Sequence, residues 1–336
     1  MNILITGANG FLGSSIVRQA LASGMAFRAT DLQPDSYISG IDYKSADITN
    51  PSTLTPVLTG ITGVIHAAGL AHVFDSSQAK KAIFNAVNVT GTVNMIHAAV
   101  LAGAKSFVLV SSVSVYGQEA LMINETAPCH PQGPYAESKW QAEQRAIEIA
   151  GAAGLNLTIL RLATLYGERD PGNVGRLIGA LNRGRFFWIG DGRNRKSLLY
   201  KGDAARACLT ALNNAVSGVN LYNVSAPPCT MHEIVDGITA ALGKHPLPGR
   251  VPVSLALLLS RNLSRIPIGR VPGIHQTLKK WLAEDVYDTR RFEEDCRFKT
   301  KTDLADGLKR EVDWYRKNHK NGRVALTNDL RRTDDL

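Results

Sequence analysis

Apolar residues in the first half of the chain alternate between the spacing of strands and the spacing of helices. Short apolar runs typical of buried strands lie at residues 3–5, 26–32, 63–69, 106–112 and 156–162. Apolar residues at helical spacing follow the first run and recur at residues 83–103 and 138–154. Strands that alternate with helices in this way predict an α/β fold with a doubly wound parallel sheet.

The pattern is looser after about residue 165. Helices are expected at residues 174–184, at 203–214 and from Met231 onward, with one further strand at 221–225. The chain therefore predicts a sheet domain and a smaller C-terminal α/β domain that mainly binds substrate. The expected bounds are 1–165 for the sheet domain, with its sheet completed by 198–225, then 166–320 for the smaller domain and 321–336 for a polar, flexible tail.

A glycine-rich turn, GANGFLG, connects the first strand to the first helix. Its glycines, Gly7, Gly10 and Gly13, recur at three-residue intervals. In this context one glycine permits the tight turn, one lets backbone approach a pyrophosphate, and one lets the helix pack close to the strand. The free N–H groups at the start of the helix then favour phosphate. The turn predicts a dinucleotide-binding site, with a glycine turn that binds no ligand as the alternative.

An acidic residue at the end of the second strand bears on which dinucleotide is bound. Asp31 stands 18 residues after Gly13. A carboxylate there can accept hydrogen bonds from the adenosine ribose and would repel a 2′-phosphate. Arg28 occupies an alternate position of the strand and is expected to point away from Asp31. The sequence therefore predicts NAD rather than NADP, with a solvated carboxylate in a turn as the alternative.

A serine, a tyrosine and a lysine supply the candidate catalytic groups. Ser112 ends the strand SFVLVSS, at the sheet edge where open α/β sheets bind ligands. Tyr135 and Lys139 stand four residues apart at the start of a predicted helix, so they share one face. A phenol with its ordinary pKa of about 10 is a poor base at neutral pH. The Lys139 ammonium and a positively charged nicotinamide ring would both favour the phenolate and lower that pKa.

Together these motifs resemble the extended short-chain dehydrogenase/reductase family, which includes NAD-dependent nucleotide-sugar epimerases and dehydratases. The resemblance extends from residue 2 to about residue 320 and implies a Rossmann fold. The segment ADIT resembles the family motif that contacts the adenine of the cofactor. The segment HAAGL resembles the strand end that lies beside the nicotinamide in the family, and NVTGT carries the family's asparagine at Asn88. The resemblance implies a catalytic triad of Ser112, Tyr135 and Lys139, in which Lys139 also binds the nicotinamide ribose. It implies that NAD is bound by Gly7, Gly10, Phe11, Leu12, Gly13, Asp31, Asp47, Ile48, Ala67, Ala68, Gly69, Asn88, Tyr135 and Lys139.

The residues expected to contact the substrate are less closely matched. In sugar epimerases an asparagine at the position of Thr164 binds the diphosphate, and an arginine often stands near the position of Lys196. The adjacent Arg195 and Lys196 could hold phosphates, or could be solvated charges in a loop. The expected substrate-binding residues are Ser112, Ser114, Thr164, Asn173, Arg195 and Lys196.

Two positions distinguish this chain from other branches of the family. Dehydratases carry an Asp-Glu pair just after the catalytic hydroxyl residue, and related decarboxylases carry a glutamate at the second position. Val113 and Ser114 stand there instead, so elimination and decarboxylation are not expected. The remaining chemistry needs hydride transfer and one base.

A nucleotide-sugar epimerase that inverts C4 of a hexose through a transient ketone is therefore the first expectation. An NAD-dependent alcohol dehydrogenase or ketone reductase with a non-nucleotide substrate is the alternative. A non-catalytic nucleotide-binding protein is a third interpretation, which the presence of both Tyr135 and Lys139 disfavours.

Composition and charge exclude several other classes. The chain has 336 residues, of which 44% are hydrophobic and 20% charged, and its formal net charge is +9. It has no basic block interleaved with aromatic residues, so the positive charge is expected to reflect a solvated surface or the attraction of an anionic small substrate rather than binding of nucleic acid. The cysteines lie far apart without a CxxC pair, which predicts reduced thiols and no metal site. They are Cys129, Cys208, Cys229 and Cys296.

The start of the chain and its most apolar segment bear on location. The first strand begins at residue 2, so no signal peptide is expected and the protein is expected in the cytoplasm. Residues 251–268 are too short and too interrupted by proline and arginine to span a bilayer. We expect a helix of the smaller domain there and no stable membrane insertion, with a helix on a membrane surface or a lid as the alternative. The formation of a homodimer is left open.

Overall fold

Six parallel strands form the central sheet of the computed structural model, which describes residues 2–71, 78–117, 120–244, 249–263, 278–279 and 281–319. The chain runs from the middle of the sheet to one edge, crosses back, and then builds toward the other edge. This order confirms the predicted doubly wound α/β fold. From one edge of the sheet to the other, the strands are β11 (Val219–Val224), β6 (Asn156–Leu162), β4 (Ser106–Ser112), β3 (Gly63–His66), β1 (Ile3–Thr6) and β2 (Phe27–Thr30).

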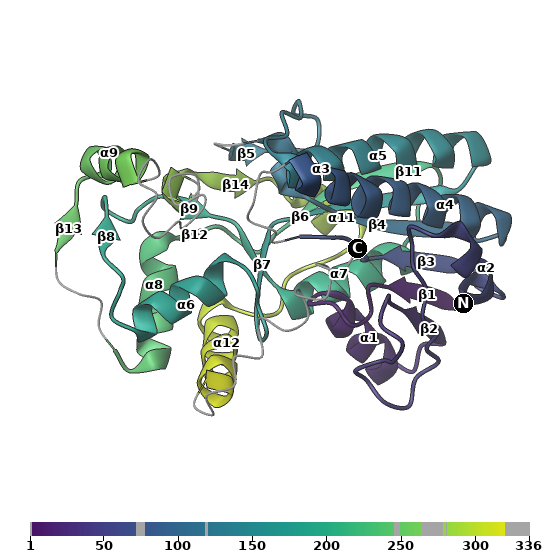
Figure 1. Ribbon diagram of the computed structural model, residues 1–336, viewed down its shortest axis with the longest axis horizontal. Helices are drawn as coiled ribbons and strands as arrows, with labels where there is room; N and C mark the ends of the chain where they lie inside the picture. The colour runs from purple at the N-terminus through teal and green to yellow at the C-terminus, as the bar shows by residue number, and fades with distance from the viewer. Residues whose placement is uncertain are drawn as a thin grey trace.

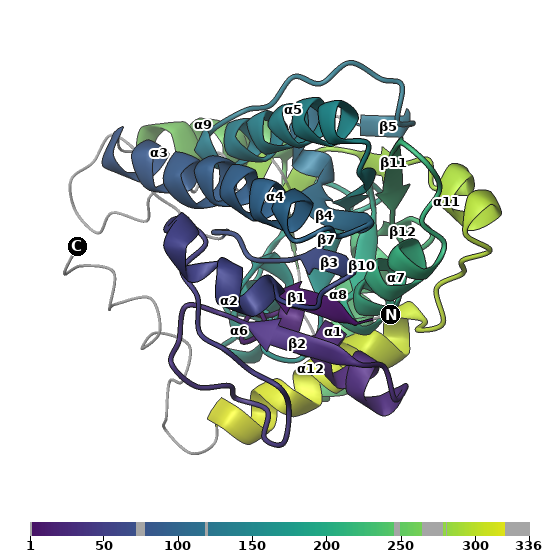
Figure 2. The same cartoon turned by 90° about the vertical axis from the view of Figure 1, so that its right-hand side faces the viewer.

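Helices cover both faces of this sheet (Figures 1 and 2). On one face α1 (Gly13–Ala22) and α7 (Lys201–Asn213) bury an apolar cluster that includes Ile3 of β1. On the other face α2 (Thr55–Leu58), α4 (Gly91–Leu101) and α5 (Pro134–Ala153) bury a cluster that includes Leu4. The two neighbouring residues face opposite layers because side chains alternate along a strand.

The helix expected at residues 83–103 is interrupted by a π-helical segment. α3 (Gln78–Phe84) leads into this segment, Asn85–Thr90, and α4 continues from it. A π-helical turn changes the direction of the side chains that it carries, but its apolar spacing does not distinguish it from an α-helix. The structure uses this turn to bury Asn88 against the residues that follow β3.

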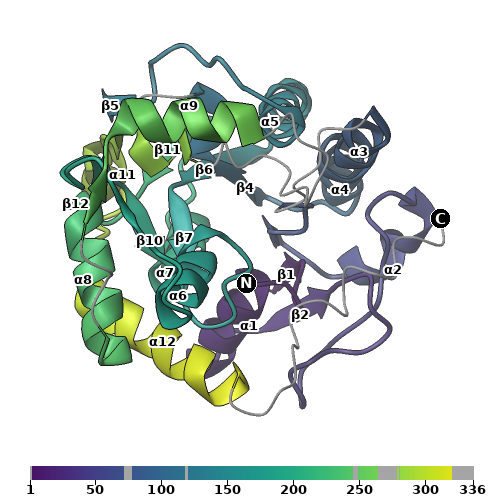
Figure 3. The same cartoon turned by 60° about the vertical axis from the view of Figure 1, so that its left-hand side comes forward.

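Short strands and three packed helices make up the C-terminal region (Figures 1 and 3). The helices α6 (Asn173–Asn182), α8 (Met231–Leu242) and α12 (Leu304–His319) share one apolar cluster. The predicted helix within residues 251–268 is α9 (Val253–Leu263), and the predicted tail 321–336 lies outside the described residues. Among the described residues no helix has the length and apolar character needed to cross a membrane.

The strands of this region form three small sheets, and several of them have no counterpart in the sequence-based expectation. β10 (Leu198–Tyr200) pairs with β7 (Thr164–Tyr166), and β13 (Arg250–Val251) pairs with β8 (Trp188–Ile189). The third sheet has the order β12 (Cys229–Thr230), β9 (Arg195–Lys196), β14 (Asp285–Tyr287) and β5 (Ala120–Ile123). Strands of two to four residues are too short to show a clear alternation.

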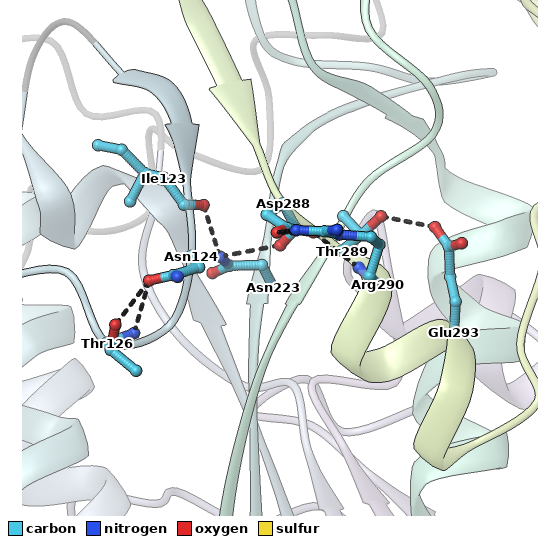
Figure 4. A network of polar contacts seen from close by, with 8 residues as sticks. All are labelled: Ile123, Asn124, Thr126, Asn223, Asp288, Thr289, Arg290 and Glu293. Carbon is cyan, nitrogen blue, oxygen red and sulfur yellow. Dashed lines mark hydrogen bonds and ion pairs between the residues drawn. The ribbon is translucent and has the colours of Figure 1, made fainter.

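One buried asparagine joins the central sheet to this third sheet (Figure 4). The Nδ2 group of Asn223, in β11, donates to the Ile123 carbonyl at 3.1 Å and to the Asp288 carbonyl at 3.3 Å. Its Oδ1 atom accepts a hydrogen bond from the Tyr116 hydroxyl at 2.8 Å. Ile123 ends β5, and Asp288 lies between β14 and α11 (Arg290–Asp295). A single side chain therefore holds both strands against the edge of the central sheet.

A buried ion pair joins α5 to β6. Arg161 donates from Nε and Nη2 to the Glu143 carboxylate, with distances of 3.1 Å to Oε1 and 2.6 Å to Oε2. The side chains are 3% and 0% exposed, and the Ser111 hydroxyl also donates to Glu143. Removing one partner of such a pair leaves an uncompensated charge in the interior.

We predict that Glu143→Gln lowers the free energy of unfolding by about 3–5 kcal/mol, because the Arg161 charge stays buried without its counter-ion. Urea denaturation measures the change. Glu148→Gln is the matched control, because Glu148 forms an exposed pair with Arg145 on the same helix and is expected to contribute less than about 1 kcal/mol. Equal losses in the two variants would contradict the prediction.

Candidate active site

The glycine turn leaves no room for side chains at its closest approaches. Gly7 has a φ of +68°, and a methyl group on it would lie 2.7 Å from the Ala68 nitrogen. A methyl group on Gly13 would lie 1.8 Å from the Gly7 carbonyl oxygen, and one on Gly10 would lie 3.0 Å from it. The three glycines thus have the separable roles expected from the sequence: a turn, a close approach and a tight packing of α1 on β1.

This turn fits the phosphates of a dinucleotide. α1 begins at Gly13 without a side-chain cap, so its first N–H groups are directed toward the turn. The two residues between Gly10 and Gly13 have different surroundings. Leu12 is buried in the core, whereas Phe11 is partly exposed and its ring centre lies 5.5 Å from Lys201 Nζ.

Asp31 lies beside the turn, one residue after β2. Its carboxylate accepts hydrogen bonds from the backbone N–H of Asn9 at 2.9 Å and of Leu32 at 2.8 Å. Arg28 is turned away from it, as expected, and pairs with Asp42 at 2.9 Å. These contacts fix the carboxylate at the edge of the glycine turn, where it would repel a 2′-phosphate.

Asp47 and Ile48 occupy the next connection along the same edge. The Asp47 carboxylate accepts hydrogen bonds from both the backbone N–H and the hydroxyl of Thr49, each at 2.8 Å. Ile48 is 6% exposed and packs beneath Gly91, where a methyl group would lie 2.6 Å from its Cδ1 atom. In the structure Asp47 therefore stabilises the turn in which it lies, and Ile48 packs against the start of α4.

The residues that follow β3 lie directly against α5, the helix that carries Tyr135 and Lys139. A methyl group on Gly69 would lie 3.1 Å from Asn88 Oδ1 and 3.9 Å from Lys139 Nζ. Asn88 accepts a hydrogen bond from the Leu70 N–H at 2.7 Å and donates to Ser138 at 2.9 Å. The segment Ala67–Gly69, which the resemblance places beside the nicotinamide, is thus held between β1 and α5.

Ser112, Tyr135 and Lys139 meet at the carboxyl end of β4. The Ser112 hydroxyl lies close enough to the Tyr135 phenol to act on its pKa, and it accepts a hydrogen bond from the Ser114 N–H at 3.2 Å. Lys139, 8% exposed, donates from Nζ to the Val110 carbonyl at 2.5 Å. The aromatic rings of Phe84 and Tyr135 meet edge to face at 6.1 Å between centroids. Ser112 and Tyr135 are therefore neighbours, Lys139 follows Tyr135 by four residues on α5, and their joint catalytic role stays a prediction.

Burial shifts the pKa values of both Tyr135 and Lys139. Burial raises the pKa of Tyr135 above its ordinary value, and the nearby Ser112 hydroxyl only partly opposes that shift. Burial also lowers the pKa of Lys139 to about 8, although Glu143 acts in the opposite direction. Among the described residues Ser112 is the neighbour that opposes burial at Tyr135, so the contribution of Lys139 and the nicotinamide ring to lowering the tyrosine pKa stays a prediction.

A small pocket in the C-terminal region collects three of the expected substrate-binding residues. Thr164, Asn173 and Lys196 line it together with Ser197, Leu198, Trp281 and Asp285. Lys196 donates to Asp285 at 2.9 Å, and its side chain is only 6% exposed. Sequence reasoning missed Trp281 and Asp285, which no local motif marks because they reach the pocket from the far end of the chain.

Of the three other expected contacts, Ser112 lies beside Tyr135, and Arg195 and Ser114 lie in different surroundings. Arg195 is exposed and pairs with Glu284 at 3.4 Å, so it does not line the pocket with Lys196. The two are neighbours in β9, and successive strand residues face opposite sides. Ser114 follows β4 in a 3₁₀ turn (Val113–Tyr116), and its buried hydroxyl has no hydrogen-bond partner among the described residues.

These features are typical of a nicotinamide-dependent enzyme. The sheet is doubly wound, the glycine turn approaches the end of β3, and α5 carries Tyr135 and Lys139 next to Ser112 at the end of β4. Residues 3–225 match the NAD dependent epimerase/dehydratase family, and the chain belongs to that family. This confirms the resemblance seen in the sequence. NAD is accordingly the cofactor, and the glycine turn has the shape that it requires.

Several characterised relatives and solved structures are similar to this chain. An N-acetyl-alpha-D-glucosaminyl-diphospho-ditrans,octacis-undecaprenol 4-epimerase of Escherichia coli O157:H7 is 32% identical over 260 residues, covering 76% of this chain and 77% of that protein. A 2-alkyl-3-oxoalkanoate reductase of Stenotrophomonas maltophilia (strain K279a) is 27% identical and covers 92% of this chain and 98% of the reductase. The structure of MoeE5 in complex with UDP-glucuronic acid and NAD is 27% identical, with a TM-score of 0.75, and covers 95% of this chain and 100% of that one.

We predict that NAD raises the thermal stability of the protein more than NADP does, and that Asp31→Asn narrows the difference. The Asp31 carboxylate would repel the extra phosphate, and tenfold tighter binding adds about 1.4 kcal/mol at saturating ligand. Thermal shifts with each cofactor measure the effect. Asp42→Asn removes an equal charge that faces Arg28 and should leave the preference unchanged. Equal shifts with both cofactors in the unmodified protein would contradict the assignment.

Proposed function

We propose that this protein is an NAD-dependent epimerase that inverts C4 of a nucleotide-linked hexose through a transient ketone. The observation that carries the proposal is the position of Ser112 beside Tyr135 and of Lys139 beside Gly69, in the segment that the glycine turn approaches. Relatives named as 4-epimerases, from Escherichia coli O157:H7 and Vibrio cholerae, support it. So does MoeE5, whose structures contain NAD with UDP-glucose or UDP-glucuronic acid.

Tyr135 is the proposed base. In its ionised form it takes the proton of the C4 hydroxyl, while Ser112 donates a hydrogen bond to the same oxygen. Bound NAD supplies the site that accepts hydride from C4 and gives it back. After the hexose presents its opposite face, Tyr135 returns the proton to the carbonyl oxygen. The product is the C4 epimer, and no net oxidation or reduction occurs.

Lys139 is proposed to make Tyr135 acidic enough for this role. Burial has raised the pKa of the phenol, so the ionised form needs a positive charge close by. Lys139 lies one helical turn further along α5, and with a pKa of about 8 it is largely protonated at neutral pH. A charge that has already left water acts more strongly on its neighbours than a solvated one.

The pocket around Lys196 is the proposed position of the substrate diphosphate. Thr164, Asn173 and Lys196 offer hydroxyl, amide and ammonium donors on one wall. Asp285 orients the lysine, whereas Arg195 faces away and is no longer part of the proposed anchor. The unpartnered hydroxyl of Ser114 lies next to the catalytic strand end and is proposed to bind a sugar hydroxyl.

The reductase relative favours a second candidate function. A dehydrogenase or ketone reductase needs the same base and cofactor but no anchored diphosphate, and the Stenotrophomonas reductase matches nearly the whole chain. Dehydratases also match, including a dTDP-glucose 4,6-dehydratase of Streptomyces griseus at 28% identity. Val113 and Ser114 supply no acid–base pair for elimination, so dehydration is not proposed.

We predict that Tyr135→Phe lowers turnover by about 10²–10⁴-fold, the usual contribution of one general base, while NAD binding is preserved. Steady-state rates and a cofactor titration measure the two properties. Tyr222→Phe is the control, because its hydroxyl contacts Asp295 at 3.1 Å on the far side of the sheet. If Tyr135→Phe kept more than about a tenth of the activity, another group would be the base.

The fate of the hydride distinguishes the two candidate functions. An epimerase keeps its cofactor through the ketone stage, so NAD is expected to co-purify and activity to need no added NAD. With a UDP-hexose, we predict inversion at C4, followed by NMR, without growth of NADH absorbance. Steady stoichiometric NADH formation from an alcohol, without inversion of any nucleotide sugar, would instead establish the dehydrogenase.

A further inference from the structure

The helix α9 directs three of its leucines toward solvent. Leu255, Leu258 and Leu259 are 46%, 58% and 50% exposed, whereas Ala256 and Ser260 are buried. The three leucines recur at i, i+3 and i+4, so they form one stripe along the helix. A helix that only packs on its own domain has the opposite arrangement, with leucines inside and serine outside.

The helix α9 lies at the end of the molecule farthest from the first strands (Figure 1). Two further apolar side chains belong to the same end. Val253 begins α9 and is 39% exposed, and Phe187, just before β8, is 57% exposed. β8 pairs with β13, which leads into α9, and Gly190 donates a backbone hydrogen bond to Val251 at 3.0 Å. We call this ensemble, residues 185–193 and 250–260, the α9 tip.

Exposed arginines flank the two short strands of the α9 tip. Arg185 precedes β8, Arg193 follows it, and Arg250 opens β13, and all three are exposed. Within the described residues of the tip, Asp191 is the single acidic residue, and it pairs with Arg193 at 4.0 Å. No ion pair involves Arg185 or Arg250 in the part of the chain that the structure describes. The tip therefore carries net positive charge.

We propose that the α9 tip binds the surface of an anionic lipid bilayer. Leucines on one face of a short helix enter the boundary between headgroups and acyl chains, and nearby basic side chains attract anionic headgroups. The helix lies in the plane of the surface and does not span it. The proposal concerns where the protein acts and does not depend on which reaction it catalyses.

The size of the stripe favours a lipid surface over a second protein chain. α9 has 11 residues, so it is about 16 Å long. A strip of this length and about 10 Å wide offers far less than the ~800 Å² that each partner buries in a stable protein complex. A bilayer needs no matching surface, and insertion of a few leucines together with electrostatic attraction is sufficient for reversible binding.

Vesicle flotation tests the proposal with the full chain. We expect binding to vesicles of equal parts phosphatidylcholine and phosphatidylglycerol, and much weaker binding to phosphatidylcholine alone. Leu258→Ser with Leu259→Ser should lower binding about tenfold or more. The control variant carries Leu21→Ser and Leu101→Ser, which replace two leucines on other helices that are 48% and 88% exposed. It should bind vesicles as the unmodified protein does. Arg185→Gln and Arg250→Gln should each lower binding to the anionic vesicles about fivefold.

Three results would overturn the proposal. The first is that the unmodified protein does not bind anionic vesicles. The second is that the tip and control variants lose vesicle binding equally. The third is that a tip variant dissociates a dimer in gel filtration but still binds vesicles as the unmodified protein does. Circular dichroism confirms that the variants are folded. Turnover of a water-soluble nucleotide sugar is measured in parallel and should be equal in the tip and control variants. A failure of that assay with the unmodified protein concerns the proposed function alone.

Discussion

The close approach of the glycine turn to the end of β3 is the constraint on which the rest of the site depends. Gly7 lies so near the Ala68 nitrogen, and Gly13 so near the Gly7 carbonyl, that a single methyl group at either position would overlap backbone. Backbone cannot move aside as a flexible side chain can, so the first helix, the cofactor turn and the strand end form one rigid unit. Gly69 continues this unit to Lys139, and the cofactor cradle and the catalytic helix are thereby fixed relative to each other.

The buried ion pair holds the other side of the same site. Glu143 lies one helical turn beyond Lys139 and binds both Arg161 of β6 and Ser111, the neighbour of Ser112. One carboxylate therefore connects the helix that carries Tyr135 to the two strands beside it. A pair of apolar residues could stabilise the fold equally well, but it would not fix direction in this way. The ion pair also affects the chemistry, because Glu143 opposes the loss of charge that burial imposes on Lys139.

The cofactor half of the protein could be predicted from its sequence because each of its functional elements is local. The glycine turn, Asp31 after β2 and the Tyr135–Lys139 spacing each lie within a few residues of one strand or helix, where periodicity and motif agree. The substrate half could not be predicted to the same depth. Its pocket joins Thr164, Lys196 and Asp285 from strands of two or three residues, and such contacts depend on the whole fold. The π-helical turn at Asn88 was missed for a related reason, since its sequence fits a continuous helix.

The two adjacent basic residues in β9 show how burial decides which charge can serve a site. Arg195 stands in solvent, where water and salt screen its charge and its pairing with Glu284 contributes little. Lys196, one residue further, is turned inward and held by Asp285, so its ammonium group occupies a fixed position in a region of low dielectric. A fixed buried donor gives an anionic substrate a defined orientation, but the neighbouring carboxylate reduces the net attraction. If the pocket holds the substrate diphosphate, as we propose, Lys196 is better suited to selecting how that diphosphate lies than to attracting it from solution. The long-range attraction would then come from the exposed cations that contribute to the net charge of +9.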